Sequence, residues 1–229
     1  MNLDAIVQSL PQYLAGTVTT VKLLLVSLAL GLLAAVPLAV ARASANPWAR
    51  LPVWAFTYVI RGTPLLVQLF LVYYGAAQFG AVRDSAAWPL LSNAWFCAVL
   101  AFAVNTCAYT VEIIAGALRA TPAGEVEAAR SLGMSAPTLM RRILLPSALR
   151  RSLPAYGNEV ILMLHGTSLA SVVTLLDITG AARELNSKYF LPFEAFITAA
   201  VFYLALTFAF VTLFRRAEAR WLRHLAPRR

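Results

Sequence analysis

The sequence predicts an all-α, polytopic integral membrane protein with five transmembrane helices. Hydrophobic residues make up 60% of the 229 residues and charged residues only 13%, whereas a soluble domain is about 45–50% apolar and about 25% charged. The mean hydropathy is +0.72. This composition excludes a disordered chain, which lacks apolar residues, and two cysteines are too few for a small disulfide scaffold. We expect one membrane domain over residues 1–229.

Five stretches without Asp, Glu, Lys or Arg supply the transmembrane helices. They hold between 17 and 27 residues, and a helix needs about 17–25 apolar residues to cross a bilayer. The shortest stretch follows Glu159 and needs some residues upstream of it. We expect the spans at about residues 13–41, 64–82, 88–117, 154–177 and 192–214.

The basic residues are distributed unevenly between the segments that connect these spans. Fifteen of the 19 lysines and arginines fall in residues 42–61, 119–151 and 215–229. Because basic residues collect in cytoplasmic loops, these three segments are expected in the cytoplasm, with the N-terminus outside and the C-terminus inside. The net charge of +9 therefore indicates contact with membrane lipid and requires no nucleic acid partner.

A polar interruption, Arg61-Gly62-Thr63-Pro64, precedes the second span. Proline suits the first turn of a helix and threonine suits its cap. The second span is therefore expected to begin at Pro64 with Thr63 as its cap. Residues 51–60 would form a short lead-in that lies along or just within the membrane.

The longest connection, about residues 120–153, carries two short helices. The first starts at Thr121-Pro122 and ends at Gly133, and the second opens at Ser135 and runs until Pro146. With about 11 and about 9 residues, neither spans the roughly 30 Å hydrocarbon core. Both helices are therefore expected on the cytoplasmic face.

The second of these helices has an apolar stripe at helical spacing, with Arg141 and Arg142 off the stripe. Such a helix fits against its own membrane core, against lipid headgroups, or against another protein. The neighbouring Glu127-Ala128-Ala129 favours docking of another protein, because two alanines let a second backbone approach closely. The residues by themselves leave these alternatives open.

The same segment resembles the EAA loop of the integral membrane subunits of bacterial ABC importers, whose pattern is E-A-A-x3-G-x9-I-x-L-P. All seven defining positions match: Glu127, Ala128, Ala129, Gly133, Ile143, Leu145 and Pro146. The resemblance extends over nearly the whole chain and points to the polar amino acid permease subfamily, in particular to the membrane subunits of histidine/lysine/arginine/ornithine importers. The residues that carry it outside the loop include Arg61-Gly62-Thr63-Pro64, Asn105-Thr106, Glu112 and Asn158-Glu159.

This resemblance implies a type I ABC importer permease fold with a cytoplasmic coupling helix. The chain would form the translocation path for a basic amino acid such as histidine, lysine, arginine or ornithine, and the seven EAA residues would couple that path to an ATPase. A permease for another polar amino acid such as glutamine is the alternative. A self-contained secondary transporter is less well supported, because five spans are few for an inverted-repeat carrier and the two halves show no likeness.

The resemblance also implies partners in a bacterial inner membrane. These are a dimer of ATP-binding subunits, a second permease subunit that is expected to be a related sister chain, and a periplasmic amino-acid-binding protein. The chain has no G-x-x-x-x-G-K-[ST] loop to hold phosphates. ATP is therefore expected on the partner ATPase, and this chain is expected to be no enzyme and to hold no cofactor or metal. Cys97 and Cys107 are interpreted as small buried hydrophobes.

Ionisable groups inside a span cost about 2.5–3.5 kcal/mol at the helix centre on insertion scales, so each of them needs a reason. Glu159, with Asn158 beside it and Met163 one turn further, is a candidate for the translocation path, where it would meet a cationic or amine-bearing substrate. Alternatively, Glu159 is a structural partner of Arg61. Arg61 is either a cytoplasmic gate or a headgroup anchor, and Asn105 either lines the path or packs between helices.

Two further polar side chains are expected to have structural roles. Glu112, at the inner end of the third span, is expected to snorkel or to form an ion pair. His165 lies deep in the fourth span, where a polar group needs a partner on a neighbouring helix.

Overall fold

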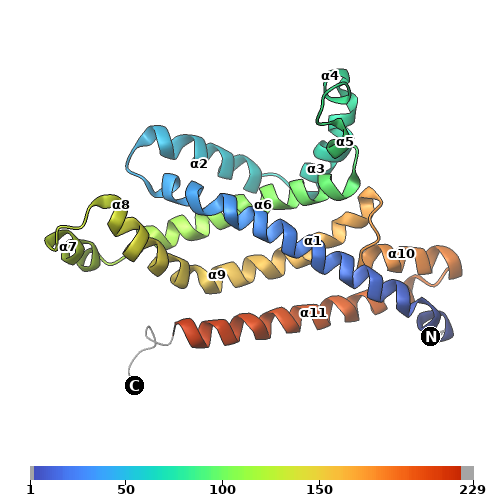
Figure 1. Cartoon of the computed structure of the whole chain (residues 1–229). Helices are drawn as coiled ribbons and strands as arrows, with labels where there is room; N and C mark the ends of the chain where they lie inside the picture. The colour runs from blue at the N-terminus through green and yellow to red at the C-terminus, as the bar shows by residue number, and fades with distance from the viewer. Residues whose placement is uncertain (1–2, 223–229) are drawn as a thin grey trace.

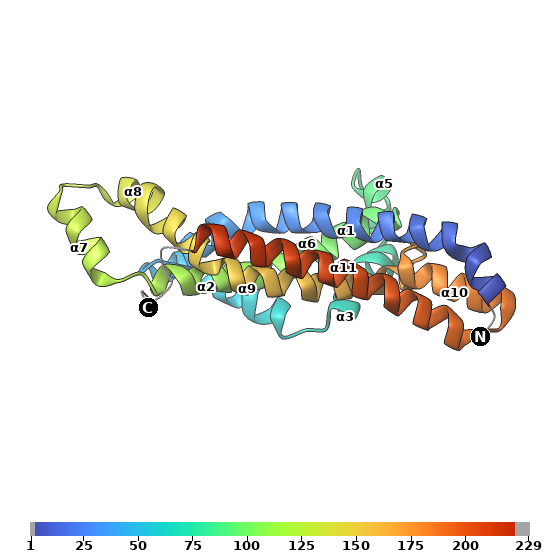
Figure 2. The same cartoon turned by 90° about the horizontal axis from the view of Figure 1, so that it is seen from below.

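The computed structural model describes residues 3–222, and every regular element in that part of the chain is a helix. Four long helices run side by side as the body of the molecule (Figures 1 and 2): α1 (Leu3–Ala43), α6 (Ala94–Arg119), α9 (Leu145–Gly166) and α11 (Pro192–Trp221). α6 is central, because it contacts both α1 and α9. The prediction of an all-α membrane protein is confirmed.

Three of the described helices, α1, α6 and α11, are long and apolar enough to cross a membrane. Two bent pairs raise the number to five if each pair is one span. One pair joins α2 (Pro47–Arg61) to Leu65–Gln78, and the other joins Ala136–Val173 to α10 (Ile178–Tyr189). The length and composition of the helices thus accommodate five spans, while the boundaries of each span stay predictions.

The crossing of α1 and α6 depends on a small residue. A Cβ placed on Gly31 of α1 would lie 2.4 Å from Thr106 Cγ2 and 3.0 Å from the Ala103 carbonyl oxygen of α6. Small residues let membrane helices approach closely, which matters because lipid leaves little hydrophobic force to press them together. Leu24 of α1 and Phe102 of α6 are fully buried in the main core cluster of the bundle.

The N-terminal part of α1 extends beyond the main bundle and packs against α10 and α11. The Tyr13 hydroxyl donates a hydrogen bond to the Ala195 carbonyl at 2.8 Å, and the Tyr13 ring stacks on Phe202 at 5.4 Å between centroids. Upstream of the first predicted span, α1 keeps contact with α10, because Gln8 accepts from the Tyr189 hydroxyl at 2.9 Å and Gln12 donates to Glu184 at 3.1 Å.

The chain bends by 100° between α2 and the path that begins with α3 (Leu65–Phe70). The expected cap at Thr63 is wrong: Pro64 is the N-cap residue of α3, and Thr63 Oγ1 donates at 3.0 Å to a carbonyl of α2. Gln68 Nε2 donates to the Ile60 carbonyl at 2.7 Å and to the Thr63 carbonyl at 3.1 Å. The glutamine thereby ties α3 back to the end of α2 and to the turn that follows it.

The predicted lead-in over residues 51–60 belongs to α2, which packs against α1 and α6 as part of the bundle (Figure 1). After α3, an arm rises from the body and returns to α6 (Figure 1). Asn93 then caps α6, because its side chain accepts hydrogen bonds from the backbone of Trp95 and Phe96. The arm consists of η1 (Leu71–Gly75), η2 (Ala76–Gln78), α4 (Gly80–Arg83) and α5 (Trp88–Leu91).

Between α6 and α9 lie α7 (Ala123–Ser131), α8 (Ala136–Leu139) and the π-helical turn η3 (Met140–Leu144). The expected end of the second loop helix at Pro146 is wrong, because η3 leads directly into α9 and Pro146 stands in the first turn of α9. A proline is tolerated there, since it follows a π turn that shifts the backbone hydrogen bonds. The loop is therefore one short helix followed by a helical path into the bundle.

α9 passes into the 3₁₀ segment η4 (Thr167–Val173), which ends at Thr174. Thr174 has a φ of +69°, which is uncommon for a β-branched residue. Asp177 then caps α10: it accepts a hydrogen bond from the Gly180 amide at 2.8 Å and another from the Tyr203 hydroxyl at 3.0 Å. The predicted end of the fourth span is thus a helix cap that also ties α10 to α11.

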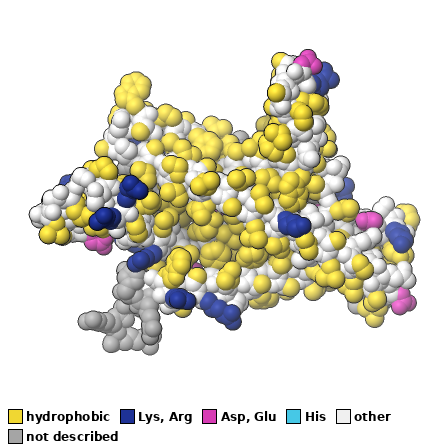
Figure 3. All heavy atoms as spheres, viewed as in Figure 1, with side chains coloured by type: hydrophobic (Ala, Val, Ile, Leu, Met, Phe, Trp, Pro, Cys, Tyr) yellow, Lys and Arg dark blue, Asp and Glu magenta, His cyan; other side chains and the backbone are white. Residues whose placement is uncertain are grey.

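Apolar side chains cover the middle of the face shown in Figure 3. α11 has such a surface along much of its length, because only 11% of its most apolar 18-residue stretch is buried. Its exposed apolar residues include Val201, Leu204, Phe208 and Leu213. A surface of this kind suits lipid or another membrane subunit and is unlike that of a soluble monomer.

Candidate coupling loop and polar cluster

α7 and α8 protrude from one end of the bundle, and α10 and the N-terminus lie at the other end (Figures 1 and 2). The C-terminal end of α11 lies on the same side as α7 and α8 (Figure 1). The EAA pattern, residues 127–146, thus lies at one pole of the molecule. Part of it is in the protruding loop and the rest is at the base of that loop.

Gly133 ends α7 in a Schellman motif. Its φ is +74°, the Met134 amide donates to the Ala129 carbonyl at 3.2 Å, and the Gly133 amide donates to the Arg130 carbonyl at 2.9 Å. This pair of bonds closes the C-terminus of a helix and strongly favours glycine at the left-handed position. The predicted turn at Gly133 is confirmed, and it directs the chain from α7 into α8.

The two alanines of the EAA pattern do not lie on the same side of α7. Glu127 and Ala128 are exposed, but Ala129 is only 2% exposed, so it packs inside the loop. The interpretation that both alanines admit a second backbone is therefore wrong for Ala129. Leu132, which no sequence motif marks, is the exposed apolar residue near the end of α7, with 83% of its surface exposed.

The remaining EAA residues form the base of the loop. Ile143 lies in η3, and Leu145 and Pro146 begin α9; all three are half-buried. Leu145 packs against a core cluster that includes Ala39 of α1 and Ile114 of α6. The base of the loop is thus packed directly against two long helices.

Arg151 also supports the loop, and the sequence argument did not single it out. Its guanidinium donates to the Ser147 hydroxyl at 2.8 Å, the Ala117 carbonyl at 3.3 Å and the Thr121 hydroxyl at 2.6 Å. These bonds tie α9 to the end of α6 and to the start of the loop. In the sequence, Arg151 is one of several arginines in this segment and nothing marks it. Its supporting role comes from contacts with Ala117 and Thr121, which are distant in the sequence.

Three of the candidate path residues come together at the break between α2 and α3. The Arg61 guanidinium lies 5.1 Å from the centroid of the Tyr109 ring, and Asn105 Nδ2 donates to Gln68 Oε1 at 3.0 Å. Glu159 is only 5% exposed and lies close enough to Thr106 and Arg61 for both to act on its carboxylate, although the Thr106 hydroxyl makes no hydrogen bond within residues 3–222. This polar cluster, Arg61, Gln68, Asn105, Thr106, Tyr109 and Glu159, joins α2, α3, α6 and α9.

The other two candidates lie elsewhere. Asn158 is exposed and lines a cavity of about 380 Å³ with Phe214, Arg215 and Glu218 of α11. Met163 is only 3% exposed and belongs to the main core cluster, so it presents almost no surface to a path in this conformation.

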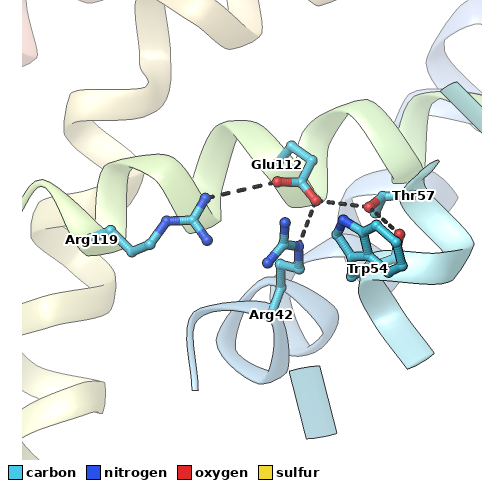
Figure 4. A network of polar contacts seen from close by, with 5 residues as sticks. All are labelled: Arg42, Trp54, Thr57, Glu112 and Arg119. Atoms are coloured by element: carbon cyan, nitrogen blue, oxygen red, sulfur yellow. Dashed lines mark hydrogen bonds and ion pairs between the residues drawn. The ribbon is translucent and has the colours of Figure 1, made fainter. Parts of the chain in front are cut away.

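Glu112 and His165 have the structural partners that were expected for them. Glu112 Oε1 accepts from Arg42 Nε and from Thr57 Oγ1 at 2.6 and 2.7 Å, and Arg119 lies 3.8 Å from Oε2 (Figure 4). The network thus joins α1, α2 and α6. His165 Nε2 lies 3.2 Å from Thr207 Oγ1 on α11.

Comparison with known sequences gives consistent matches over most of the chain. A family model described as the binding-protein-dependent transport system inner membrane component matches residues 27–223. The histidine/lysine/arginine/ornithine transport system permease protein HisM of Salmonella typhimurium is 50% identical over 218 residues, covering 93% of this chain and 91% of the relative. The nopaline transport system permease protein NocM of Agrobacterium fabrum is 45% identical over 219 residues, covering 95% and 91%.

Solved structures show the same architecture. A chain of an amino acid ABC transporter crystallised with histidines has a TM-score of 0.86 and 35% identity, covering 96% of this chain and 99% of that one. A chain of the inward-facing MetNI methionine ABC transporter has a TM-score of 0.69 at 19% identity, covering 94% and 95%. The second likeness concerns the fold alone.

Proposed function

Because the chain belongs to the family of inner-membrane components of binding-protein-dependent transport systems, we propose that it is the permease subunit of an importer for basic amino acids. As a permease it is a multi-pass protein of the bacterial inner membrane and is not itself an enzyme. The observation that carries the proposal is the exposed EAA helix and turn at one pole of a bundle, in a chain 50% identical to a histidine/lysine/arginine/ornithine permease. That relative supports the substrate class.

The proposed orientation places α7, α8 and the C-terminus in the cytoplasm and the N-terminus in the periplasm. It is supported by the basic residues of the three segments expected inside, of which Arg223, Arg228 and Arg229 lie outside the described residues. In this orientation α10 and the N-terminal part of α1 face the periplasm. The spans would follow the five predicted ranges.

The coupling proposal assigns α7 and Gly133 to a groove of an ATPase dimer, which would bind the ATP. Glu127, Ala128 and Leu132 offer the contact surface, and Arg130, Arg141 and Arg142 are exposed for acidic partner groups. Ala129 would hold α7 inside the loop, and Ile143, Leu145 and Pro146 would hold the loop to the bundle. Closure of the ATPase dimer would push the loop, and the contacts of Leu145 and Arg151 would pass the motion to α1 and α6.

The path proposal uses the polar cluster at the helix break. The Arg61 guanidinium lies over the Tyr109 ring, and its charge acts on the Glu159 carboxylate without an ion pair between them in residues 3–222. A cationic substrate would bind beside Glu159 and complete the pairing of its charge. Glu159 and Asn105 are only 5% and 6% exposed, so opening of the helix break would have to expose them to the substrate. Asn158 would line the path from the separate cavity beside α11. A second permease subunit, which we propose is a sister chain, would close the path, because five spans enclose one poorly. A periplasmic binding protein would deliver the amino acid.

The function is tested by reconstitution of this chain with its ATPase, its second permease subunit and its binding protein in proteoliposomes. We expect uptake of labelled arginine that requires ATP and is competed by lysine and histidine but not by glutamine. Uptake by this chain alone without ATP would contradict the importer function. Equal competition by glutamine would contradict only the basic substrate class.

Replacement of Glu159 by Gln tests the path in the same assay. Removing the negative charge should reduce uptake of cationic substrate at least about tenfold, since buried hydrogen-bonded charge pairs across interfaces are worth several kcal/mol. The control Glu184→Gln alters an exposed carboxylate on α10 and should leave uptake unchanged. Normal uptake by an assembled Glu159→Gln complex would remove this residue from the path.

A further inference from the structure

A groove at the pole that carries the coupling loop gathers arginines from three helices. Arg42 at the end of α1, Arg50 in the first turn of α2 and Arg119 at the end of α6 line one cavity of about 380 Å³. Ala43, Ser44, Leu51 and Trp54 complete its walls. An adjoining cavity of about 260 Å³ shares Arg42 and Trp54 and is lined by Glu112.

The charges in this groove do not cancel. Among residues 3–222, Glu112 is the one carboxylate that lines it, and it pairs with Arg42 at 2.6 Å and with Arg119 at 3.8 Å. Arg42 and Arg119 lie in the last turns of their helices, where the negative end of the helix dipole offsets part of their charge. Arg50 lies where the dipole of α2 is positive, and no ion pair reaches it within residues 3–222.

The rim of the groove is apolar and aromatic. Leu51 and Trp54 are 52% and 45% exposed, and Trp54 stacks on the exposed ring of Tyr58 at 5.3 Å between centroids. Trp and Tyr side chains concentrate at the level of lipid headgroups, and Leu51 adds apolar surface beside them. The groove therefore combines a cationic floor with a wall suited to lipid.

We propose that this groove binds the phosphate headgroup of an anionic phospholipid of the cytoplasmic leaflet. Guanidinium groups match phosphate oxygens in geometry and charge, and basic pockets between transmembrane helices on the cytoplasmic side bind such headgroups. A free phosphate ion shares the headgroup chemistry but makes no use of Leu51 and Trp54. The bound lipid would tie together the end of α1, the start of α2 and the end of α6, and Arg151 anchors the coupling loop to the end of α6.

The test compares lipid retention in variants of the complete transporter. The complex is released from nanodiscs of mixed phosphatidylglycerol and phosphatidylcholine and analysed by native mass spectrometry. We expect the wild type to retain phosphatidylglycerol selectively and Arg50→Gln to reduce that retention about fivefold, from about 1 kcal/mol per basic residue near a lipid surface. Arg50 is chosen because its removal breaks no ion pair among the described residues. Arg83→Gln, on the arm, is the matched control and should retain lipid normally.

Three results would overturn the proposal. The first is equal phosphatidylglycerol retention in the wild type and the folded Arg50→Gln complex. The second is displacement of the lipid by excess inorganic phosphate, which would assign the groove to a free anion. The third is loss of the ATPase from the Arg50→Gln complex with lipid retained, which would assign the groove to a protein contact. The cytoplasmic location rests on the proposed orientation, but retention is measured without transport, so its failure leaves the transport function standing.

Discussion

The backbone at Gly133 has a φ of +74°, and no atom lies within 4 Å of the position that a Cβ would take. An added side chain therefore meets no steric obstacle, and its cost is conformational. For an L-residue the left-handed region costs roughly 1–2 kcal/mol. The strain would fall on the turn that links α7 to α8, and so on the surface proposed to contact the ATPase.

We predict that Gly133→Ala loosens this turn by about 1–2 kcal/mol. Hydrogen exchange at the Met134 amide, which closes the Schellman motif, should become faster, and ATPase activity stimulated by the binding protein should fall. Gly124→Ala is the matched control, because Gly124 has equally open surroundings but no positive φ. Equal effects of the two substitutions would contradict a conformational role for Gly133.

Single residues differ in how far the sequence determines their role. The turn at Gly133 was predictable because its cause is local: a glycine follows a short polar helix. The burial of Ala129 was not, because two adjacent alanines look alike until α8 packs on one side of α7. Thr63 was predicted to cap α3, but its hydroxyl bonds to α2 instead. The sequence did not show this, because the side chain that holds the Thr63 hydroxyl, Gln68, lies five residues further on.

At the scale of elements, the close crossing of α1 and α6 holds the bundle together. Hydropathy alone indicated these long helices, because long apolar stretches need no tertiary information. The breaks were harder to predict. The π turn η3 lets the helical path continue past Pro146, and the 3₁₀ segment η4 follows α9 without any proline or glycine inside it to mark it.

We predict that Gly31→Ala forces α1 away from α6, since its Cβ would lie 2.4 Å from Thr106 Cγ2. Overpacking of this kind costs about 1–3 kcal/mol, so the melting temperature of the detergent-solubilised complex should fall by several degrees. Gly116→Ala on α6 meets no atom within 4 Å and should be neutral or slightly stabilising. A normal melting temperature for Gly31→Ala would show that the crossing is looser than described.

At the scale of the whole molecule, two exposed apolar residues mark opposite poles: Leu132 beside α7, and Phe190 at the end of α10. Their positions turn the proposed orientation into a labelling pattern. We predict that Leu132→Cys reacts with a membrane-impermeant maleimide only from the cytoplasmic side and Phe190→Cys only from the periplasmic side. The native cysteines, Cys97 and Cys107, are buried and should stay silent. Labelling of both positions from one side would refute the topology.

The central claim is that the exposed face of α7 docks on an ATPase, and cysteine cross-linking tests it most directly. Ala128 is exposed and the adjacent Ala129 is 2% exposed, so the two positions form a matched pair. In membranes that contain the assembled transporter, Ala128→Cys should cross-link to the ATPase subunit, with a yield that changes when ATP is added, and Ala129→Cys should not. Absence of a cross-link from Ala128→Cys in an assembled complex, or an equal yield from both positions, would contradict the account.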